Sequence, residues 1–493
     1  MKQIYVYVVL AAFMSMVSTK SLAYDVVVEN EDGVRIYYNY INNGTELEVA
    51  RSAYTGDVVI PEIVTILNRT RKVTSIGEKA FYDCKKLTSV TIPGSVTSID
   101  EDAFLDCNGL KKVIVKDIAV WCNISFSSSW SNPLSFAEHL YVDEDTEITD
   151  LVIPDGVMSI NKYAFYNCRN LTSVTIPSSV ASIGGDAFKG CESLTRVIVK
   201  DLAAWCNISY ELGIRSDYGN PLYYAKHLYV DEDTEITDLV IPDGVTSINE
   251  YAFYNCRSLT SVTIPSSVTH IGAYAFYDCG LEKVIVKDIA AWCNISFGYA
   301  ANPLLQAKHL YVDEDTEITD LVIPDGVTSI NEYAFYYCKS LTSVAIPSGV
   351  MRIGQEAFRS CESLTSVVIP SSVTSIDMWA FLGCDSLATI VSLIDDPASV
   401  WCGSAFFGNF TLNNATLYVP QGTIEKYKAA DRWKEFVWIE EDVSTNIKLS
   451  KNGEAGTAEA QRYTIDGQRI AGSKCGLNIM KMSDGTVKKV IVK

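Results

Sequence analysis

Short runs of alternating apolar and polar residues recur along most of the chain. Within residues 87–104, Val90 and Ile92 alternate with Ser89 and Thr91, which predicts a short half-buried strand. A proline ends this strand, because proline has no N–H to donate to the next ladder hydrogen bond. One unit cannot bury its apolar residues alone, so the pattern predicts units stacked strand upon strand about 4.8 Å apart.

The motif Ala-Phe-x-x-Cys-x-x-Leu marks these units, and one copy is a residue shorter before its leucine. Its phenylalanines are Phe81, Phe104, Phe165, Phe188, Phe253, Phe276, Phe335, Phe358 and Phe381. Neighbouring copies within a cluster are 23 residues apart, and the clusters begin 84, 88 and 82 residues apart. The chain is therefore a repeat of a repeat, in which each module holds two short units and an insert of about 60 residues.

The inserts are regular as well. Each contains Trp-Cys-Asn-Ile-Ser, then Asn-Pro-Leu, and then His-Leu-Tyr-Val-Asp-Glu-Asp-Thr-Glu. We interpret His-Leu-Tyr-Val and the later Thr-Asp-Leu-Val-Ile as the two arms of a hairpin with an acidic tip at Asp143–Glu147. A solvated tip is the simpler interpretation, and calcium binding is the alternative, although the string lacks the glycine and ligand order of an EF-hand loop.

The first 23 residues predict a secretory signal peptide. Lys2 precedes the uncharged stretch Ile4–Val17, and Ser21-Leu22-Ala23 supplies a cleavage pattern. A membrane-spanning helix is the alternative, but this stretch is shorter than the ~20 residues that a bilayer requires. The formal net charge of −20 argues against nucleic acid and anionic membranes as main partners.

The unit Leu-x-x-Val-x-Ile-Pro-x-x-Val-x-x-Ile-x-x-x-Ala-Phe-x-x-Cys resembles the leucine-rich repeat of the BspA-like (Treponema-type) class. The resemblance covers residues 58–440 and implies a leucine-rich-repeat solenoid that is rich in β-strands, of the α/β repeat class. Residues 24–57 resemble the short β-rich cap that precedes such arrays. Tyr427 and Trp433 are then expected to cover the last apolar layer.

The end of the chain also resembles surface proteins of this class from Bacteroidetes-like bacteria. Residues 441–460 are polar and predict a linker. Residues 461–493 resemble a small C-terminal β sorting domain, with Asp484-Gly485 as its hairpin signal. The resemblance implies export through a type IX-like system and attachment outside the outer membrane, with no transmembrane span.

The chain has 14 cysteines, and most of them occur at a fixed phase of the repeat. Nine follow the repeated phenylalanine by three residues and four follow a tryptophan, while Cys475 stands alone. A residue that occupies the same position in every repeat unit is expected to have a structural role, so we expect buried structural thiols. Stacked disulfides and a metal site are the alternatives.

No catalytic motif or cofactor motif is found, and the four histidines do not form one asymmetric cluster. We therefore expect a non-enzymatic protein without a cofactor. The exposed phases of the strands hold serine and threonine, and a tyrosine often follows the repeated phenylalanine. A polar face that completes the strands, with partly buried tyrosines, is the simpler interpretation, and a ligand face for protein or glycan is the functional one. This candidate face comprises Ser89, Thr91, Ser173, Thr175, Ser261, Thr263, Ser343, Tyr82, Tyr166, Tyr254, Tyr277 and Tyr336.

The BspA-like resemblance implies a secreted or cell-surface binding protein. An adhesin-like protein that recognises host extracellular or microbial surface proteins is the leading hypothesis. An envelope protein that captures glycan or nutrient, and a structural spacer of the surface layer, are the alternatives. The ligand face would serve a protein or a glycan, and the sequence does not choose between them.

Overall fold

The computed structural model describes residues 24–211 and 219–441, together with the backbone of four strands between residues 459 and 492. The predicted signal peptide and most of the predicted linker lie outside the described residues. Cys475 and the Asp484-Gly485 pair also lie outside them. The four tail strands form an antiparallel sheet in the order β37-β36-β38-β39. Their bounds are β36 (Glu459–Thr464), β37 (Arg469–Ile470), β38 (Gly476–Met482) and β39 (Val487–Val492).

Each short repeat folds into one coil that consists of a longer strand, a short strand and a turn. In one such coil, β14 (Ser173–Ile176) ends before Pro177, and β15 (Ser182–Ile183) follows it. The turn then places Phe188 and Cys191 in the core, where neither is exposed to solvent. Leucine-rich coils of this kind stack into a solenoid, as the alternating pattern predicts.

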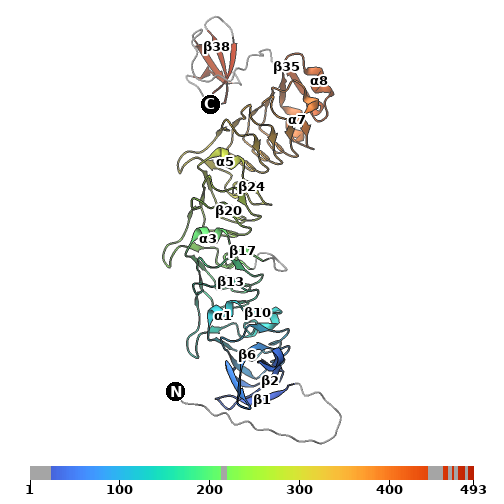
Figure 1. Cartoon of the computed structure of the whole chain (residues 1–493). Coiled ribbons are helices and arrows are strands. Elements are labelled where there is room, and N and C mark those ends of the chain that lie inside the picture. Colours follow the sequence, from blue (N-terminus) through green and yellow to red (C-terminus); the bar gives the residue numbers. More distant parts are fainter. Residues whose placement is uncertain are drawn as a thin grey trace. The chain divides into compact units, whose positions relative to one another are not determined.

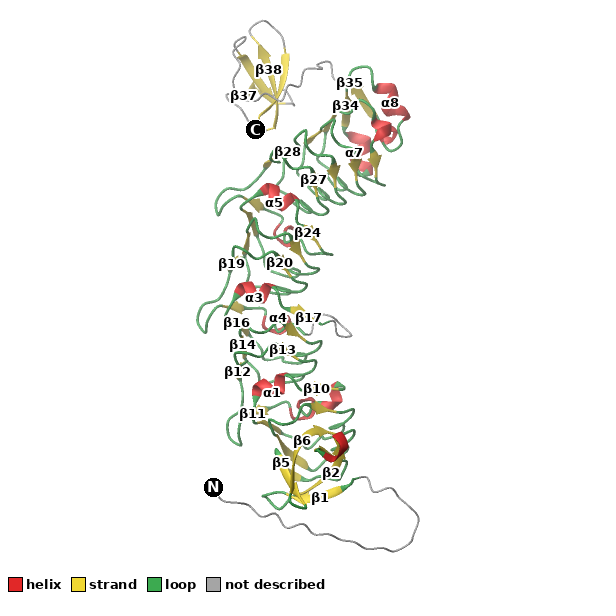
Figure 2. Cartoon of the chain, in the orientation of Figure 1, coloured by secondary structure: helices red, strands yellow, loops and turns green. Residues whose placement is uncertain are grey.

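The first unit of the chain comprises residues up to 236 together with 251–258. Its longer strands form two parallel sheets, ordered β11-β9-β7-β4 and β12-β14-β16-β18 (Figure 2). Their bounds are β4 (Gly56–Val59), β7 (Leu87–Ile92), β9 (Lys112–Val115), β11 (Leu140–Tyr141), β12 (Asp150–Val152), β16 (Arg196–Val199) and β18 (Leu228–Tyr229). The short strands pair in parallel too, and they include β8 (Ser98–Ile99), β10 (Ser125–Phe126), β13 (Ser159–Ile160) and β17 (Ser209–Tyr210).

An irregular group of strands covers the N-terminal end of this unit. The strands β1 (Val26–Glu29), β2 (Arg35–Ile41) and β3 (Glu46–Val49) pair in antiparallel fashion, and the 3₁₀ turn η1 (Asn42–Gly44) joins the last two. Strand β3 then pairs in parallel with β6 (Arg69–Ile76), and β5 (Ile63–Ile66) pairs with β6 in antiparallel fashion. Figure 1 labels β1, β2 and β6 of this group. Ile36 and Leu47 are fully buried, so these strands shield the apolar end of the coils.

The second unit comprises residues 237–250 and the chain from 259 onward. Its longer strands form the parallel sheets β19-β21-β23-β25 and β26-β28-β30-β32-β34-β35. These are β19 (Asp238–Val240), β21 (Ser261–Ile264), β23 (Lys283–Val286), β25 (Leu310–Tyr311), β26 (Asp320–Val322), β28 (Ser343–Ala345), β30 (Ser366–Ile369), β32 (Thr389–Ser392), β34 (Thr416–Val419) and β35 (Trp438–Glu441). Its short strands are β20 (Ser247–Ile248), β22 (His270–Ile271), β24 (Ser296–Phe297), β27 (Ser329–Ile330), β29 (Arg352–Ile353), β31 (Ser375–Ile376) and β33 (Trp401–Cys402).

Short helices lie in the inserts and at the end of the array. They are α1 (Ile118–Cys122), α2 (Leu134–Ala137), α3 (Leu202–Cys206), α4 (Leu222–Ala225), α5 (Ile289–Cys293), α6 (Leu304–Ala307), α7 (Asn409–Asn414) and α8 (Ile424–Ala429), with 3₁₀ turns η2 (Ser129–Ser131), η3 (Pro397–Ser399) and η4 (Trp433–Glu435). The insert tryptophans Trp121, Trp205 and Trp292 are buried, and Trp292 Nε1 donates to the carbonyl of Ala334 at 2.8 Å. At the end of the array, Tyr427 and Trp433 are fully buried, as expected for residues that close the core.

A column of aromatic rings and thiols runs through the core of each unit. In the second unit the rings of Phe335, Phe358 and Phe381 stack with centroid separations of 5.2 Å. Cys384 Sγ donates to the Phe358 carbonyl of the preceding coil at 3.0 Å. The thirteen described cysteines are free thiols and all but Cys402 are buried. The prediction of structural thiols is thus confirmed for them. The thiols fill space in the core, and those of Cys84, Cys107, Cys191, Cys361 and Cys384 also donate to a backbone carbonyl.

The predicted hairpin of the insert is wrong in its second arm. Val142 N donates to the Thr146 carbonyl at 3.1 Å, so a tight reversal exists around the acidic tip. The later arm, β12, instead pairs in parallel with β14 of the next coil. Pairing with β14 gives β12 ladder hydrogen bonds to the next coil, so the strand extends the parallel sheet instead of folding back onto the acidic tip.

Candidate ligand-binding cleft

The predicted strand hydroxyls are less accessible than the sequence suggested. Ser89, Ser173, Ser261 and Thr91 are buried, so the expectation that they are exposed is wrong. Their neighbours in the stack explain why, since Ser173 Oγ donates to Asp150 Oδ1 at 2.5 Å. The remaining strand hydroxyls of the candidate face are half-buried, namely Thr175, Thr263 and Ser343. The sequence shows each strand alone, whereas the covering side chains come from coils before and after it.

The same aspartate–serine contact recurs in each module. Ser261 Oγ donates to Asp238 Oδ1 at 2.6 Å, and the pKa of Asp238 is lowered because this hydrogen bond favours the ionised carboxylate. Asp150 Oδ1 lies 3.7 Å from Arg196 Nη2 in the coil on the other side of Ser173. These serines therefore hold the coils in register.

The predicted tyrosines lie in the turns rather than on the longer strands. Tyr82, Tyr166, Tyr254, Tyr277 and Tyr336 directly follow the repeated phenylalanine, and all five are half-buried. The structure therefore separates the two halves of the candidate ligand face. Their role in ligand binding stays a prediction.

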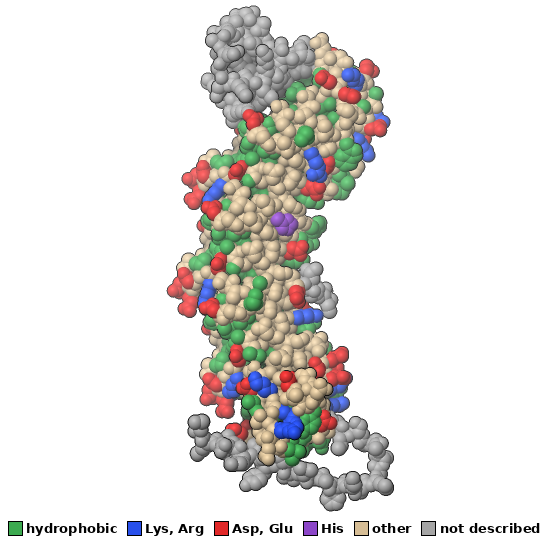
Figure 3. Space-filling model, in the orientation of Figure 1, with side chains coloured by type: hydrophobic (Ala, Val, Ile, Leu, Met, Phe, Trp, Pro, Cys, Tyr) green, Lys and Arg blue, Asp and Glu red, His purple; other side chains and the backbone are tan. Residues whose placement is uncertain are grey.

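The acidic tips of the inserts are solvated. Asp143–Asp145 are exposed, and Figure 3 shows acidic side chains gathered in separate clusters on the surface. Asp143 Oδ1 accepts hydrogen bonds from the backbone N–H groups of Asp145 and Thr146, which lowers the pKa of Asp143. His139 Nδ1 lies 2.7 Å from Glu147 Oε1 at the base of the tip. Among the described residues, no group of three or more His, Cys, Asp or Glu side chains is placed to hold a metal ion.

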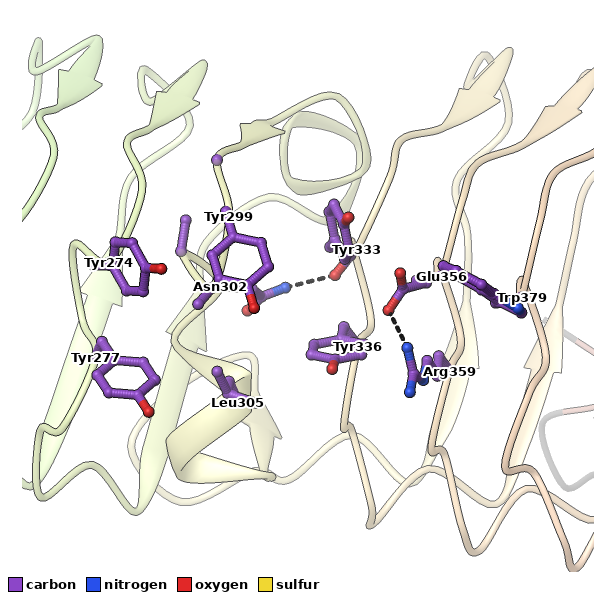
Figure 4. Close-up of a pocket in the computed structure, with 13 residues that line it drawn as sticks. Tyr274, Tyr277, Tyr299, Asn302, Leu305, Tyr333, Tyr336, Glu356, Arg359 and Trp379 are labelled. Carbon is purple, nitrogen blue, oxygen red and sulfur yellow. Dashed lines mark hydrogen bonds and ion pairs between the residues drawn. The ribbon is translucent and has the colours of Figure 1, made fainter.

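A cleft of about 540 Å³ opens among the turns of the second unit (Figure 4). It lies where one short-strand sheet ends at β24 and the next begins at β27. We call it the aromatic cleft, because its walls include Tyr274, Tyr277, Tyr299, Tyr333, Tyr336 and Trp379. Tyr277 and Tyr336 are thus the two predicted residues that the structure brings together. Tyr299 is 71% exposed and comes from the insert.

The backbone at the rim of the cleft adopts a left-handed conformation. The φ angles are 57° at Tyr274, 63° at Tyr333, 55° at Glu356 and 61° at Trp379. This conformation costs an ordinary residue roughly 1–2 kcal/mol, and aspartate or asparagine tolerates it best. The equivalent residue is Asp102 in one earlier coil and the buried Tyr163 and Tyr251 in two others, all with positive φ. A ring at this position must therefore contribute packing or binding that offsets the cost.

An ion pair provides the polar part of the cleft. Arg359 Nη1 lies 2.8 Å from the buried carboxylate of Glu356. The guanidinium also lies over the rings of Tyr336 and Trp379, 5.9 and 5.8 Å from their centroids. Burial, assisted by the Glu356 charge, raises the pKa of Tyr333, so its hydroxyl stays protonated at neutral pH. The cleft thus combines ring faces with hydrogen-bond donors and carries a paired charge.

A buried asparagine links two elements of the cleft through hydrogen bonds. Asn302 Nδ2 donates to the Tyr333 carbonyl at 2.7 Å (Figure 4). Asn302 Oδ1 accepts from the Leu304 N–H at 2.8 Å. The Asn-Pro-Leu triplet of the insert therefore ties helix α6 to the turn that carries Tyr333 and Tyr336. This explains why the triplet recurs in every insert.

A family model described as the BspA type leucine rich repeat region matches the chain in six copies. The matched residues are 62–142, 140–207, 229–300 and 311–428, which is more than half of the chain. The chain belongs to the BspA-type leucine-rich repeat family. The fold is therefore the leucine-rich-repeat solenoid that the sequence predicted. Proteins of this family are typically non-enzymatic binding proteins.

Solved structures of bacterial leucine-rich repeat proteins are similar to the chain. A protein from Bacteroides ovatus is 24% identical, with a TM-score of 0.41 over 83% of this chain and 98% of that one. A leucine rich cell surface protein from Faecalibacterium prausnitzii is 25% identical, with a TM-score of 0.32 over 75% and 95%. The pneumococcal vaccine antigen PcpA is 15% identical, with a TM-score of 0.30 over 86% and 100%. No curated protein matches the sequence.

Most residues of the cleft lie outside the recurring positions that define the BspA-type repeat unit. Sequence reasoning missed Tyr274, Tyr299, Tyr333, Glu356, Arg359 and Trp379. The missed signal is the variation at the position two residues before the repeated phenylalanine. This position is charged in some coils, namely at Lys79, Asp102, Asp186 and Glu356, and aromatic in others, namely at Tyr163, Tyr251, Tyr274, Tyr333 and Trp379. A comparison of each phase across the BspA-type coils would have marked that variation.

Within the part of the chain that the structure describes, no helix of this BspA-type protein has the length and apolar character needed to cross a bilayer.

Proposed function

We propose that this chain is a secreted or cell-surface binding protein that acts as an adhesin, recognising extracellular proteins of a host or of other microbial cells. The aromatic cleft is the observation that carries the proposal. Its volume of about 540 Å³ falls within the range typical of ligand sites, which are mostly apolar with a few placed polar groups. Family membership supports binding as the activity.

Recognition in this cleft is non-covalent. Tyrosine and tryptophan give large contact areas and lose little side-chain entropy on binding, which is why they dominate binding hot spots. Tyr299 and Trp379 reach the cleft from different coils, so one ligand would contact several repeats at once. No catalytic step is part of the proposal.

The location outside the cell rests on the two ends of the chain. We propose that residues 1–23 direct export and that residues 461–493 attach the protein to the outer surface. The described backbone of this tail forms an antiparallel sheet, which suits a small attachment domain. We also propose the domain limits given above for the cap, the repeat array and the linker.

Retention on immobilised extracellular-matrix proteins tests the proposal. Trp379→Ala should weaken retention by about tenfold, as expected when a central aromatic contact is lost. Trp130→Ala is the matched control, because Trp130 is an exposed tryptophan of an insert in the first unit, outside the cleft. A protein that none of the matrix surfaces retains, or equal losses in both variants, would contradict the proposal.

A further inference from the structure

We propose that the aromatic cleft binds a neutral oligosaccharide, whose sugar rings stack on Tyr299 and Trp379 and whose hydroxyls contact Arg359. This inference rests on the proposed function, since it assigns the chemistry of the group held in the same cleft. The glycan would be carried by the extracellular partner.

The ring faces of the cleft match the apolar faces of sugar rings. A pyranose exposes axial C–H groups on its faces, and the electron-rich face of an aromatic ring attracts them. Tyr274 and Tyr299 meet edge to face at 5.4 Å and 68°, so the rings of the cleft present faces in different directions. Tyr299 is 71% exposed, which leaves most of its ring surface open to a ligand.

The polar groups of the cleft match the hydroxyl edges of sugars. Arg359 has five N–H donors, and the Glu356 carboxylate accepts from its Nη1. The hydroxyl of Tyr333 already accepts from Gln355 Nε2 at 3.2 Å, and it keeps its own proton for donation. Planar side chains with several donors and acceptors suit ligands that carry many hydroxyls.

The charges of the cleft favour a neutral ligand. A cation would meet Arg359, which already lies over Tyr336 and Trp379. An anion would approach the Glu356 carboxylate, which is paired with the same guanidinium. Arg359 and Glu356 are already paired, so neither a cationic nor an anionic ligand would gain an unpaired opposite charge. A neutral ligand leaves this ion pair intact and brings no further charge to be desolvated.

The cleft is extended rather than point-like. Its lining runs from the coil of Tyr274 through the insert to the coil of Trp379, a distance of about 20 Å at ~4.8 Å per coil. That length accommodates a short chain of sugar rings. Proline-rich peptides also dock into aromatic grooves. The Arg359–Glu356 pair argues for the sugar, since polyproline offers carbonyl acceptors to Arg359 but no N–H donor to Glu356, whereas sugar hydroxyls donate and accept.

Calorimetric titration of the full chain with short neutral oligosaccharides of glucose, mannose, galactose and N-acetylglucosamine tests the inference. At least one should bind, and Tyr299→Ala and Trp379→Ala should weaken it by roughly two- to tenfold, the worth of an aromatic contact. Tyr299→Ala is expected to keep the wild-type melting temperature because the ring is mostly exposed. Trp130→Ala should leave binding unchanged. No binding to any of these sugars would overturn the inference, as would binding of a polyproline peptide that only the cleft variants weaken.

Enzymatic removal of glycans from the immobilised matrix proteins separates this inference from the proposed function. Retention that disappears on deglycosylation supports both. Equal retention before and after deglycosylation overturns the glycan inference and leaves protein adhesion standing. Sugar binding in solution without retention on any matrix protein supports the inference and overturns the proposed partner.

Discussion

Replacing Asn302 with alanine should destabilise the aromatic cleft because it leaves the buried N–H of Leu304 without its acceptor. The substitution removes the acceptor of the Leu304 N–H and the donor to the Tyr333 carbonyl. The carbonyl of Ala334 keeps its bond from Trp292 Nε1, and the carbonyl of Tyr333 keeps its bond from the Tyr336 N–H at 3.0 Å, so neither is orphaned. The one buried N–H left unpaired lowers local stability by about 1–3 kcal/mol.

Hydrogen exchange followed by mass spectrometry is the suitable assay, because repeat proteins need not unfold as one cooperative unit. We expect faster exchange in Asn302→Ala at helix α6 and in the turn that carries Tyr333. The control is Asn132→Ala in the first unit, where the same side chain donates to Tyr163 O at 2.7 Å. That variant should lose similar stability around its own insert while the aromatic cleft keeps its affinity. Exchange in Asn302→Ala that changes by less than the equivalent of about 1 kcal/mol would refute the reasoning.

Two further predictions concern the thiols and the repeated aspartates. Burial raises the pKa of Cys107 to about 12, so iodoacetamide should label this thiol slowly in the native protein and fully in urea; rapid native labelling, read by mass spectrometry, would contradict its placement in the core. The Ser261 hydrogen bond lowers the pKa of Asp238 in the folded protein. This hydrogen bond therefore stabilises the fold fully above the pKa of the unfolded chain, about 4, and the stabilisation is lost as the pH falls through the lower pKa of the folded state. Asp238→Asn should therefore flatten the fall in melting temperature below about pH 4, and a pH profile identical to that of the wild type would argue against this contact.

Sequence spacing was sufficient to predict the coil. The positions of Phe358, Cys361 and the proline after each strand depend only on which residues of one short segment can be buried together. Which residues of one coil are buried depends on that short segment alone, and every stacked coil buries the same positions. For this reason the solenoid and the buried thiols followed from the sequence, whereas the closing role of Trp433 was implied by the resemblance to the BspA-like class.

Only the tertiary structure decided which side chains meet across coils. Ser173 is covered because Asp150 and Arg196 occupy the same register one coil before and one coil after it. The aromatic cleft likewise joins Tyr299 of an insert to Trp379, a residue 80 positions later in the chain. The hydrophobic pattern determined the fold of each coil. The strand register and the break between modules determined which side chains of different coils meet, because both depend on backbone pairing between segments that are distant in sequence.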